Sequence, residues 1–177
     1  EKIGSFFAEN GTTAWLASVL TDTSEQTERC IDAYKAYRDS ARSGAQLLGL
    51  HMEGPFLAAE YKGAMPEELL RKGDISLVER YQALAEGAIR YITVSPEVEG
   101  VPELIPELTK RGITVAIGHS GADYATAMDA IRRGVRAVTH IGNAMRLLHQ
   151  HEPAIWGAAL ESDAYCEIIC DGRHLHP

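Results

Sequence analysis

The chain lacks the features that mark disulfide-rich, membrane-spanning or nucleic-acid-binding proteins. Only three cysteines occur among its 177 residues, and their odd number and spacing indicate neither a disulfide framework nor a CxxC metal site. No run of about 18 apolar residues and no signal-peptide pattern is present, so we expect a cytoplasmic protein with no membrane partner. The net charge is −8 and no Lys/Arg cluster stands out, which argues against a nucleic-acid partner.

Two further absences narrow the choice of possible folds. No low-complexity segment interrupts the chain, and no glycine-rich phosphate turn follows the first predicted strand, as it usually does in an open doubly wound sheet. Two of the cysteines, Cys166 and Cys170, lie in the apolar run AYCEIIC. We expect both to be buried there, because free cysteine packs as a small hydrophobic side chain.

What the sequence does contain is a repeated strand-then-helix pattern. Hydrophobic residues make up 45% of the chain, enough for the core of one domain. Short apolar runs rich in β-branched residues predict strands buried on both faces. These runs are residues 12–20, 45–53, 88–97, 113–120, 135–141 and 164–172. Apolar residues at helical spacing predict helices over residues 1–11, 24–44, 75–87, 101–112 and 122–134.

Strands that alternate with helices predict a parallel α/β sheet. Polar residues end several of the predicted strands, which is where the loops of a (β/α)8 barrel build an active site. We therefore expect residues 1–177 to form one incomplete TIM-barrel domain. It would hold about six of the eight strands of that fold, with at least one barrel strand missing at each end.

A carboxylate and two imidazoles stand at three of these strand ends. Glu53 ends the second run, His119 the fourth and His140 the fifth. An unpaired buried carboxylate is unfavourable by several kcal/mol or more, so Glu53 needs a partner. One glutamate and two histidines from separate strands suit a catalytic divalent metal that keeps a coordination position open for water. His51 shares a strand face with Glu53 and stays open as a ligand, an outer-shell residue or a core residue.

Three stretches carry a resemblance to a known family. HMEGPF, GHSGADYATAMDAIRRGVRAVTHIGNAM and DGRHLHP resemble, in order and spacing, the motifs of N-acetylglucosamine-6-phosphate deacetylases of the amidohydrolase superfamily. The resemblance implies that Glu53, His119 and His140 bind one divalent metal ion. Zinc is our prediction, with iron, cobalt and manganese also compatible with this ligand set.

The same resemblance implies a substrate, which is N-acetylglucosamine 6-phosphate. Water activated by the metal would attack the N-acetyl carbonyl and release acetate and glucosamine 6-phosphate, a step of amino-sugar catabolism. A homodimer is a further implication. The implied substrate contacts are Ala64, Met65, Asn143, Ala144, His151, Asp171 and His174.

The chain departs from the family pattern at three points, and these departures bear on whether the implied roles apply to it. Met65 stands where the family has a histidine, and His151 stands where it has an arginine. The general acid/base aspartate of the family would lie beyond Pro177, and so would the last barrel strand. The first barrel strand and a small β-domain are not in the chain either. We therefore expect this chain alone to be inactive, since a positioned carboxylate contributes about 10²–10⁴ in rate.

Two other functions stay open at this point. The changes at Met65 and His151 would also suit another N-acyl amino sugar, such as N-acetylgalactosamine 6-phosphate, or an N-acyl amino acid. The third possibility is a sugar-binding barrel that has lost its chemistry.

Overall fold

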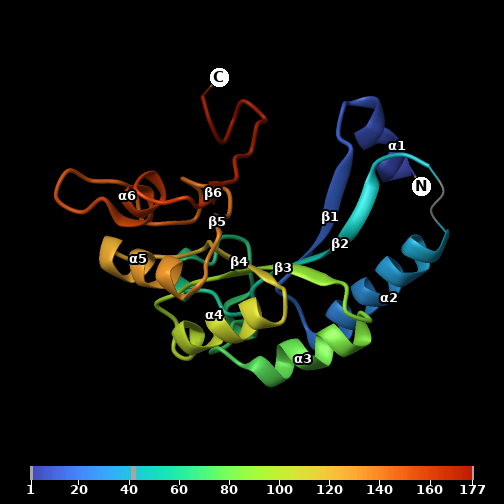
Figure 1. The fold of residues 1–177 in the computed structure, drawn as a ribbon, viewed down its shortest axis with the longest axis horizontal. Helices are drawn as coiled ribbons and strands as arrows, with labels where there is room; N and C mark the ends of the chain where they lie inside the picture. Colours follow the sequence, from blue (N-terminus) through green and yellow to red (C-terminus); the bar gives the residue numbers. More distant parts are fainter. Residues whose placement is uncertain (1, 41–42, 177) are drawn as a thin grey trace.

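A computed structural model of the chain describes residues 2–40 and 43–176. Six parallel strands form a single curled sheet in the order β1-β2-β3-β4-β5-β6, and Figure 1 shows this half-barrel with helices α2 to α5 along its outer side. The strands are β1 (Ala14–Leu20), β2 (Gln46–Glu53), β3 (Ile89–Val94), β4 (Thr114–Ile117), β5 (Ala137–Val138) and β6 (Tyr165–Cys166). The helices are α1 (Lys2–Glu9), α2 (Ser24–Ser40), α3 (Ile75–Leu84), α4 (Val101–Lys110), α5 (Tyr124–Arg133) and α6 (Ala154–Leu160).

Local sequence signals explain where the covering helices begin. The Asp74 carboxylate accepts hydrogen bonds from the backbone N–H groups of Ser76 and Leu77, and so caps α3. Asp123 caps α5 in the same way through the N–H of Thr126. The core lies between these helices and the sheet, and its fully buried side chains include Ile89, Ile92, Ile105, Leu108, Val115 and Ile117.

The register of the sheet places the carboxyl ends of its strands at one edge. Leu20 of β1 pairs with Glu53 of β2, which pairs in turn with Thr93 of β3. Val94 at the end of β3 lies beside Ile117 at the end of β4, and Ile117 beside Val138. Residues that directly follow these ends are therefore close in space although they are far apart in sequence.

The predicted rhythm is confirmed for all six strands and all five helices, with shorter bounds. The helix predicted over 24–44 ends at Ser40 in the structure, and residues 41–42 lie outside the described part. Helix α6 was not predicted. Its sequence AIWGAAL is only two turns long and has no polar face, so it gives no amphipathic signal. No helix in the described ranges is long and apolar enough to span a bilayer.

The prediction of strands buried on both faces is wrong for the two edge strands. In β1 only Val19 is buried, and β6 is exposed. Only Tyr165 and Cys166 are in β6, Tyr165 is 78% exposed, and Cys166 and Cys170 are both exposed. The reason is position: β6 is an edge strand of the described sheet and pairs with β5 alone. An apolar run at an edge has the composition of a central strand but lacks the neighbours that would bury it.

A candidate metal centre at the strand ends

Glu53, His119 and His140 meet at the carboxyl edge of the sheet. The Nε2 atom of His119 lies 3.0 Å from Oε1 of Glu53, and Nε2 of His140 lies 3.3 Å from the same oxygen. The two Nε2 atoms are 3.1 Å apart, and the imidazole rings meet edge to face at 80°. The three donor atoms thus form a tight triangle, and all three side chains are buried or half-buried.

The triangle has the size that a tetrahedral metal requires. Zinc–nitrogen and zinc–oxygen bonds of about 2.0–2.1 Å at tetrahedral angles separate neighbouring ligand atoms by roughly 3.3–3.4 Å. The observed separations of 3.0, 3.1 and 3.3 Å need only a slight expansion to reach that value. One carboxylate oxygen and two imidazole nitrogens are also a donor set that suits zinc and other divalent metals. The residues present therefore fit the implied ion.

A backbone carbonyl fixes the orientation of His119. Its Nδ1 atom lies 2.9 Å from the carbonyl oxygen of Tyr61, which can only accept, so Nδ1 carries the hydrogen and donates. In the neutral ring Nε2 then presents a lone pair to the Glu53 carboxylate. Two acceptors that face each other at 3.0 Å need a positive charge between them, either a proton or a metal ion. This arrangement is the one that outer-shell partners impose on metal-bound histidines.

The electrostatics of the cluster favour an ionised carboxylate. Burial raises the pKa of Glu53, but its hydrogen bonds with His119 and His140 outweigh burial and hold that pKa far below the ordinary value. Burial lowers the pKa of His140, and the hydrogen bond and charge of Glu53 more than compensate, so this pKa is raised. The Nδ1 atom of His140 is buried and has no hydrogen-bond partner within the described residues.

His51 does not join the cluster. Its Nδ1 is hydrogen-bonded to the hydroxyl of Ser18 at 2.9 Å, and its Nε2 to the hydroxyl of Thr93 at 2.8 Å. Both ring nitrogens are therefore occupied, and burial lowers the pKa of His51 to about 4. The structure thus favours the outer-shell or core interpretation over the ligand interpretation.

The pKa of His51 predicts a pH dependence of stability. A buried histidine whose pKa falls from 6.5 to about 4 binds fewer protons in the folded than in the unfolded chain. The contribution of His51 to the unfolding free energy should therefore fall as the pH is lowered from about 6.5 to about 4, by up to about 3 kcal/mol. Urea unfolding of metal-free protein across this range measures the effect. His51→Gln should destabilise the protein more at pH 7 than at pH 5, and an equal effect at both would contradict the prediction.

Some of the predicted substrate residues lie next to the centre. Asn143 and Ala144 follow His140 in a turn, in which the amide of Asn143 donates to the His140 carbonyl at 3.2 Å. The loop that contains Ala64 and Met65 passes close to His119. At Gly63, the residue before Ala64, an added Cβ would lie 3.4 Å from the imidazole Cε1 of His119 and 3.9 Å from Cβ of Ala144. The Met65 side chain is buried and Ala64 is exposed.

The other predicted substrate residues lie apart from the cluster. Asp171 and His174 pair with each other at 2.8 Å and are exposed, on a C-terminal segment that rises away from the sheet (Figure 1). His151 is exposed in a loop, where its hydrogen-bond partners are His149 and Gln150. The substrate roles of all these residues stay predictions.

A cavity of about 210 Å³ opens beside Glu53 and His140. One carboxylate that lies on its wall was not predicted from the sequence. Glu167 lines this cavity and accepts a short hydrogen bond from the hydroxyl of Tyr91. Burial, followed by this carboxylate, raises the pKa of Tyr91 well above its ordinary value. An acidic residue inside the apolar run AYCEIIC was the signal available for it.

The fold and the cluster define the class of protein: an α/β half-barrel with a candidate metal centre at the carboxyl ends of its strands. Across nearly its whole length, the chain is homologous to N-acetylglucosamine-6-phosphate deacetylases. It is 38% identical to such an enzyme from Bacillus subtilis over 99% of this chain and 45% of the relative. The resemblance predicted from the motifs is therefore confirmed.

A solved structure is similar in fold, and a further relative is named for the galactosamine epimer. The crystal structure of N-acetyl-D-glucosamine-6-phosphate deacetylase from Mycobacterium smegmatis superposes on this chain with a TM-score of 0.86 at 32% identity. The superposition covers 94% of this chain and 43% of the Mycobacterium chain. An N-acetylgalactosamine-6-phosphate deacetylase from Shewanella sp. is 38% identical over 94% of this chain and 42% of its own length. The chain thus spans less than half the length of these relatives. No protein-family model matches it.

Proposed function

We propose that this chain forms the metal-binding half of a hydrolase that deacetylates N-acetylglucosamine 6-phosphate to glucosamine 6-phosphate and acetate. The observation that carries the proposal is the triangle of Glu53, His119 and His140 at the strand ends, in a chain homologous to deacetylases of that name. Sequence relationship alone would be compatible with a scaffold that has lost its chemistry. The retained ligand geometry supports an enzyme.

The residues of this chain would hold the ion and keep it reactive. When bound, a divalent cation supplies Lewis-acid polarisation of the amide carbonyl and lowers the pKa of water. Glu53 would bring one negative charge to the site, and the Tyr61 carbonyl would keep the Nε2 lone pair of His119 directed at the ion. Asn143 and Ala144, in the turn beside His119, are our predicted contacts to the substrate phosphate. The general acid/base is assigned to an aspartate outside this chain.

The remaining features of the whole protein are proposals as well. A complete eight-stranded TIM barrel is supported by the curled parallel sheet and by relatives of more than twice this length. We propose that the remaining barrel strands and a small β-domain lie outside the chain. Zinc as the metal, a homodimer, a cytoplasmic location and the absence of nucleic-acid and membrane partners also remain our predictions.

Acetate release from a panel of substrates tests the proposed function. The complete protein that carries this chain should deacetylate N-acetylglucosamine 6-phosphate with the highest kcat/KM of the panel. The galactosamine epimer is the second substrate to include, because the Shewanella relative bears that name. We favour the glucosamine form, which is the substrate named for the Bacillus and Mycobacterium relatives.

Two results of this panel would overturn the proposal. A higher kcat/KM for N-acetylglucosamine without its phosphate would contradict the phosphorylated substrate. Metal binding without turnover of any N-acyl sugar would indicate the non-catalytic barrel. A preference for the epimer would keep the metal-dependent deacetylase and change only the sugar.

A further inference from the structure

We propose that Glu97 and Ser120 form a hydrogen-bonded pair that positions His119 for the metal and fixes the neighbouring turn at Ala144. The inference rests on the proposed function, because it assigns His119 to the metal. Glu97 lies three residues beyond β3, and Ser120 directly follows His119. Neither side chain is in the ligand triangle, so both are positioning residues.

His119 has a backbone conformation that its surroundings must maintain. Its φ is +50°, in the left-handed region that residues other than glycine rarely occupy. Such strain persists only where neighbouring contacts hold it in place. Ser95, which is fully buried, supplies one of these contacts by donating from Oγ to the His119 carbonyl at 2.7 Å. The residues that follow His119 need a second support.

Glu97 provides that support from the end of β3. Its Oε2 accepts a hydrogen bond from Oγ of Ser120 at 2.7 Å, and its Oε1 accepts from the N–H of Gly121 at 2.6 Å. Both bonds involve an ionised acceptor and are stronger than bonds between neutral groups. A carboxylate that binds two consecutive residues with separate oxygens fixes the direction of the chain as well as its position. The path of the chain directly after His119 is therefore set by Glu97.

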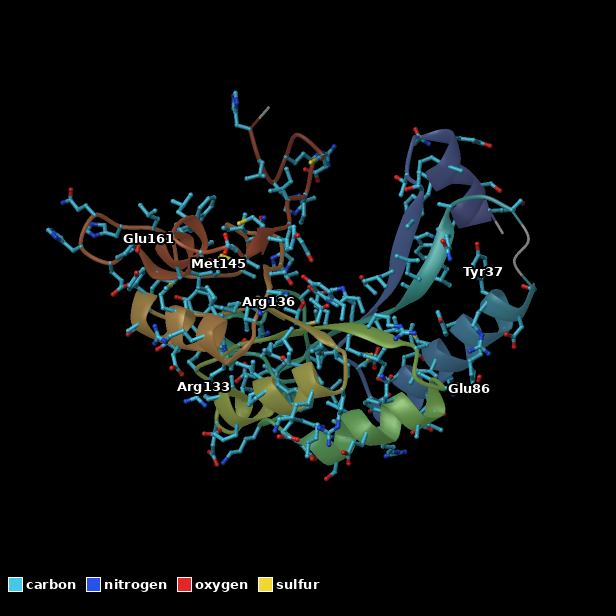
Figure 2. The ribbon with its side chains drawn as sticks, in the orientation of Figure 1. Tyr37, Glu86, Arg133, Arg136, Met145 and Glu161 are labelled. Atoms are coloured by element: carbon cyan, nitrogen blue, oxygen red, sulfur yellow. The ribbon has the colours of Figure 1, made fainter. Side chains whose placement is uncertain are left out.

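Ser120 carries the same constraint to the turn after His140. Ser120 is fully buried, and its backbone N–H donates to the carbonyl of Ala144 at 3.2 Å. Its own carbonyl accepts from the N–H of Arg146 at 3.0 Å, so it forms a short parallel bridge with Met145. Figure 2 shows Met145 near helix α6. One serine thus connects the chain at His119 with the turn predicted to contact the substrate.

The geometry makes Glu97 suitable for substitution. Its side chain is exposed, so its removal opens no cavity in the core and leaves the His119 side chain intact. Glu99, two residues further on, is a matched control, because it is also exposed and its partner is Lys72, with both side chains more than 70% exposed. A general loss of negative charge near β3 would affect both positions equally, whereas a positioning role is specific to Glu97.

Titration of the complete protein with Co²⁺ tests the inference, since the visible absorption of this ion reports its coordination geometry. Glu97→Ala should weaken Co²⁺ binding by about 10-fold or more, the scale of outer-shell substitutions, and should change the absorption spectrum. Glu97→Gln keeps one acceptor oxygen and should have a smaller effect. Ser120→Ala should reduce Co²⁺ affinity and change the spectrum as Glu97→Ala does. The double variant should lose no more Co²⁺ affinity than the more affected of the two single variants. Glu99→Ala should leave affinity and spectrum unchanged.

The outcomes separate this inference from the proposed function. If the unaltered protein binds Co²⁺ and Glu97→Ala binds it with the same affinity and spectrum, the positioning role is wrong and the metal centre stands. A lower melting temperature of Glu97→Ala with unchanged Co²⁺ binding also rejects the role, because it shows a purely structural contact. If the unaltered protein binds no Co²⁺, the metal assignment of His119 is wrong and the inference is wrong with it.

Discussion

In the complete protein that carries this chain, Glu53→Ala is expected to abolish tight metal binding and to lower the proposed deacetylation by at least about 10³-fold. The substitution removes the carboxylate that Nε2 of both His119 and His140 contacts, so the two imidazoles lose the anionic ligand that they share. Metal catalysis of this kind is worth several kcal/mol of transition-state stabilisation, which corresponds to about three orders of magnitude in rate. Metal content after dialysis and acetate release, measured on the same preparation, check both parts.

A control and an isosteric variant sharpen this experiment. Glu53→Gln keeps the size of the side chain and removes its charge, so it should bind metal much more weakly than the unaltered protein if the charge is what matters. Glu86→Ala is the control, because Glu86 forms an exposed ion pair with Arg38 at 3.0 Å, on the helical side of the molecule (Figure 2), and such pairs contribute little. Unchanged metal content and turnover in Glu53→Ala would reject the assignment of Glu53 as a ligand.

The part of this site that the sequence could predict is the part with a side-chain signal. Glu53, His119 and His140 stand at the ends of apolar runs, and parallel strands bring their carboxyl ends to one edge of the sheet. The convergence of three such residues follows from the alternation of strands and helices. Along the chain, Glu53 is 66 residues from His119 and 87 residues from His140. The three side chains are in contact because their strands end at the same edge of the sheet.

The supports of the site could not be predicted in the same way. Tyr61 acts on His119 through its backbone carbonyl, which every residue has, so the identity of the side chain gives no indication. Glu97 is an exposed acidic residue in a loop, and its two hydrogen bonds depend on where the chain after β4 passes. Local sequence fixes the existence of a strand or helix more firmly than the course of the loops that connect them.

The failures of the fold prediction have one physical cause. Burial of an apolar run depends on its neighbours in space, and composition does not report them. The run AYCEIIC has the residues of a central strand but lies at the sheet edge, where Ile168 is 55% exposed. Helix α6 shows the reverse: a short segment without a polar face is helical because it packs against α5 and its residues Ile155 and Ala158 are fully buried.

His119→Asn and His51→Asn are expected to separate metal binding from stability. Asparagine tolerates the positive φ of His119 better than most residues do, so the backbone should survive while the imidazole ligand is lost. Because outer-shell changes already reduce metal affinity by about 10–100-fold, loss of a ligand should exceed 100-fold. His51→Asn removes two hydrogen bonds inside the sheet and should lower the unfolding free energy by about 1–3 kcal/mol while Co²⁺ still binds.

Equal treatment of the two variants makes the comparison decisive. Co²⁺ titration and urea unfolding of metal-free protein should show lost Co²⁺ affinity for His119→Asn and retained affinity for His51→Asn, although both substitutions remove hydrogen bonds of a buried ring. The reason is geometric: the Nε2 atom of His119 faces Glu53 and His140, whereas both nitrogens of His51 face hydroxyl groups. If His51→Asn lost the metal and His119→Asn kept it, the ion would have to lie one layer deeper in the half-barrel, between Ser18, His51 and Thr93.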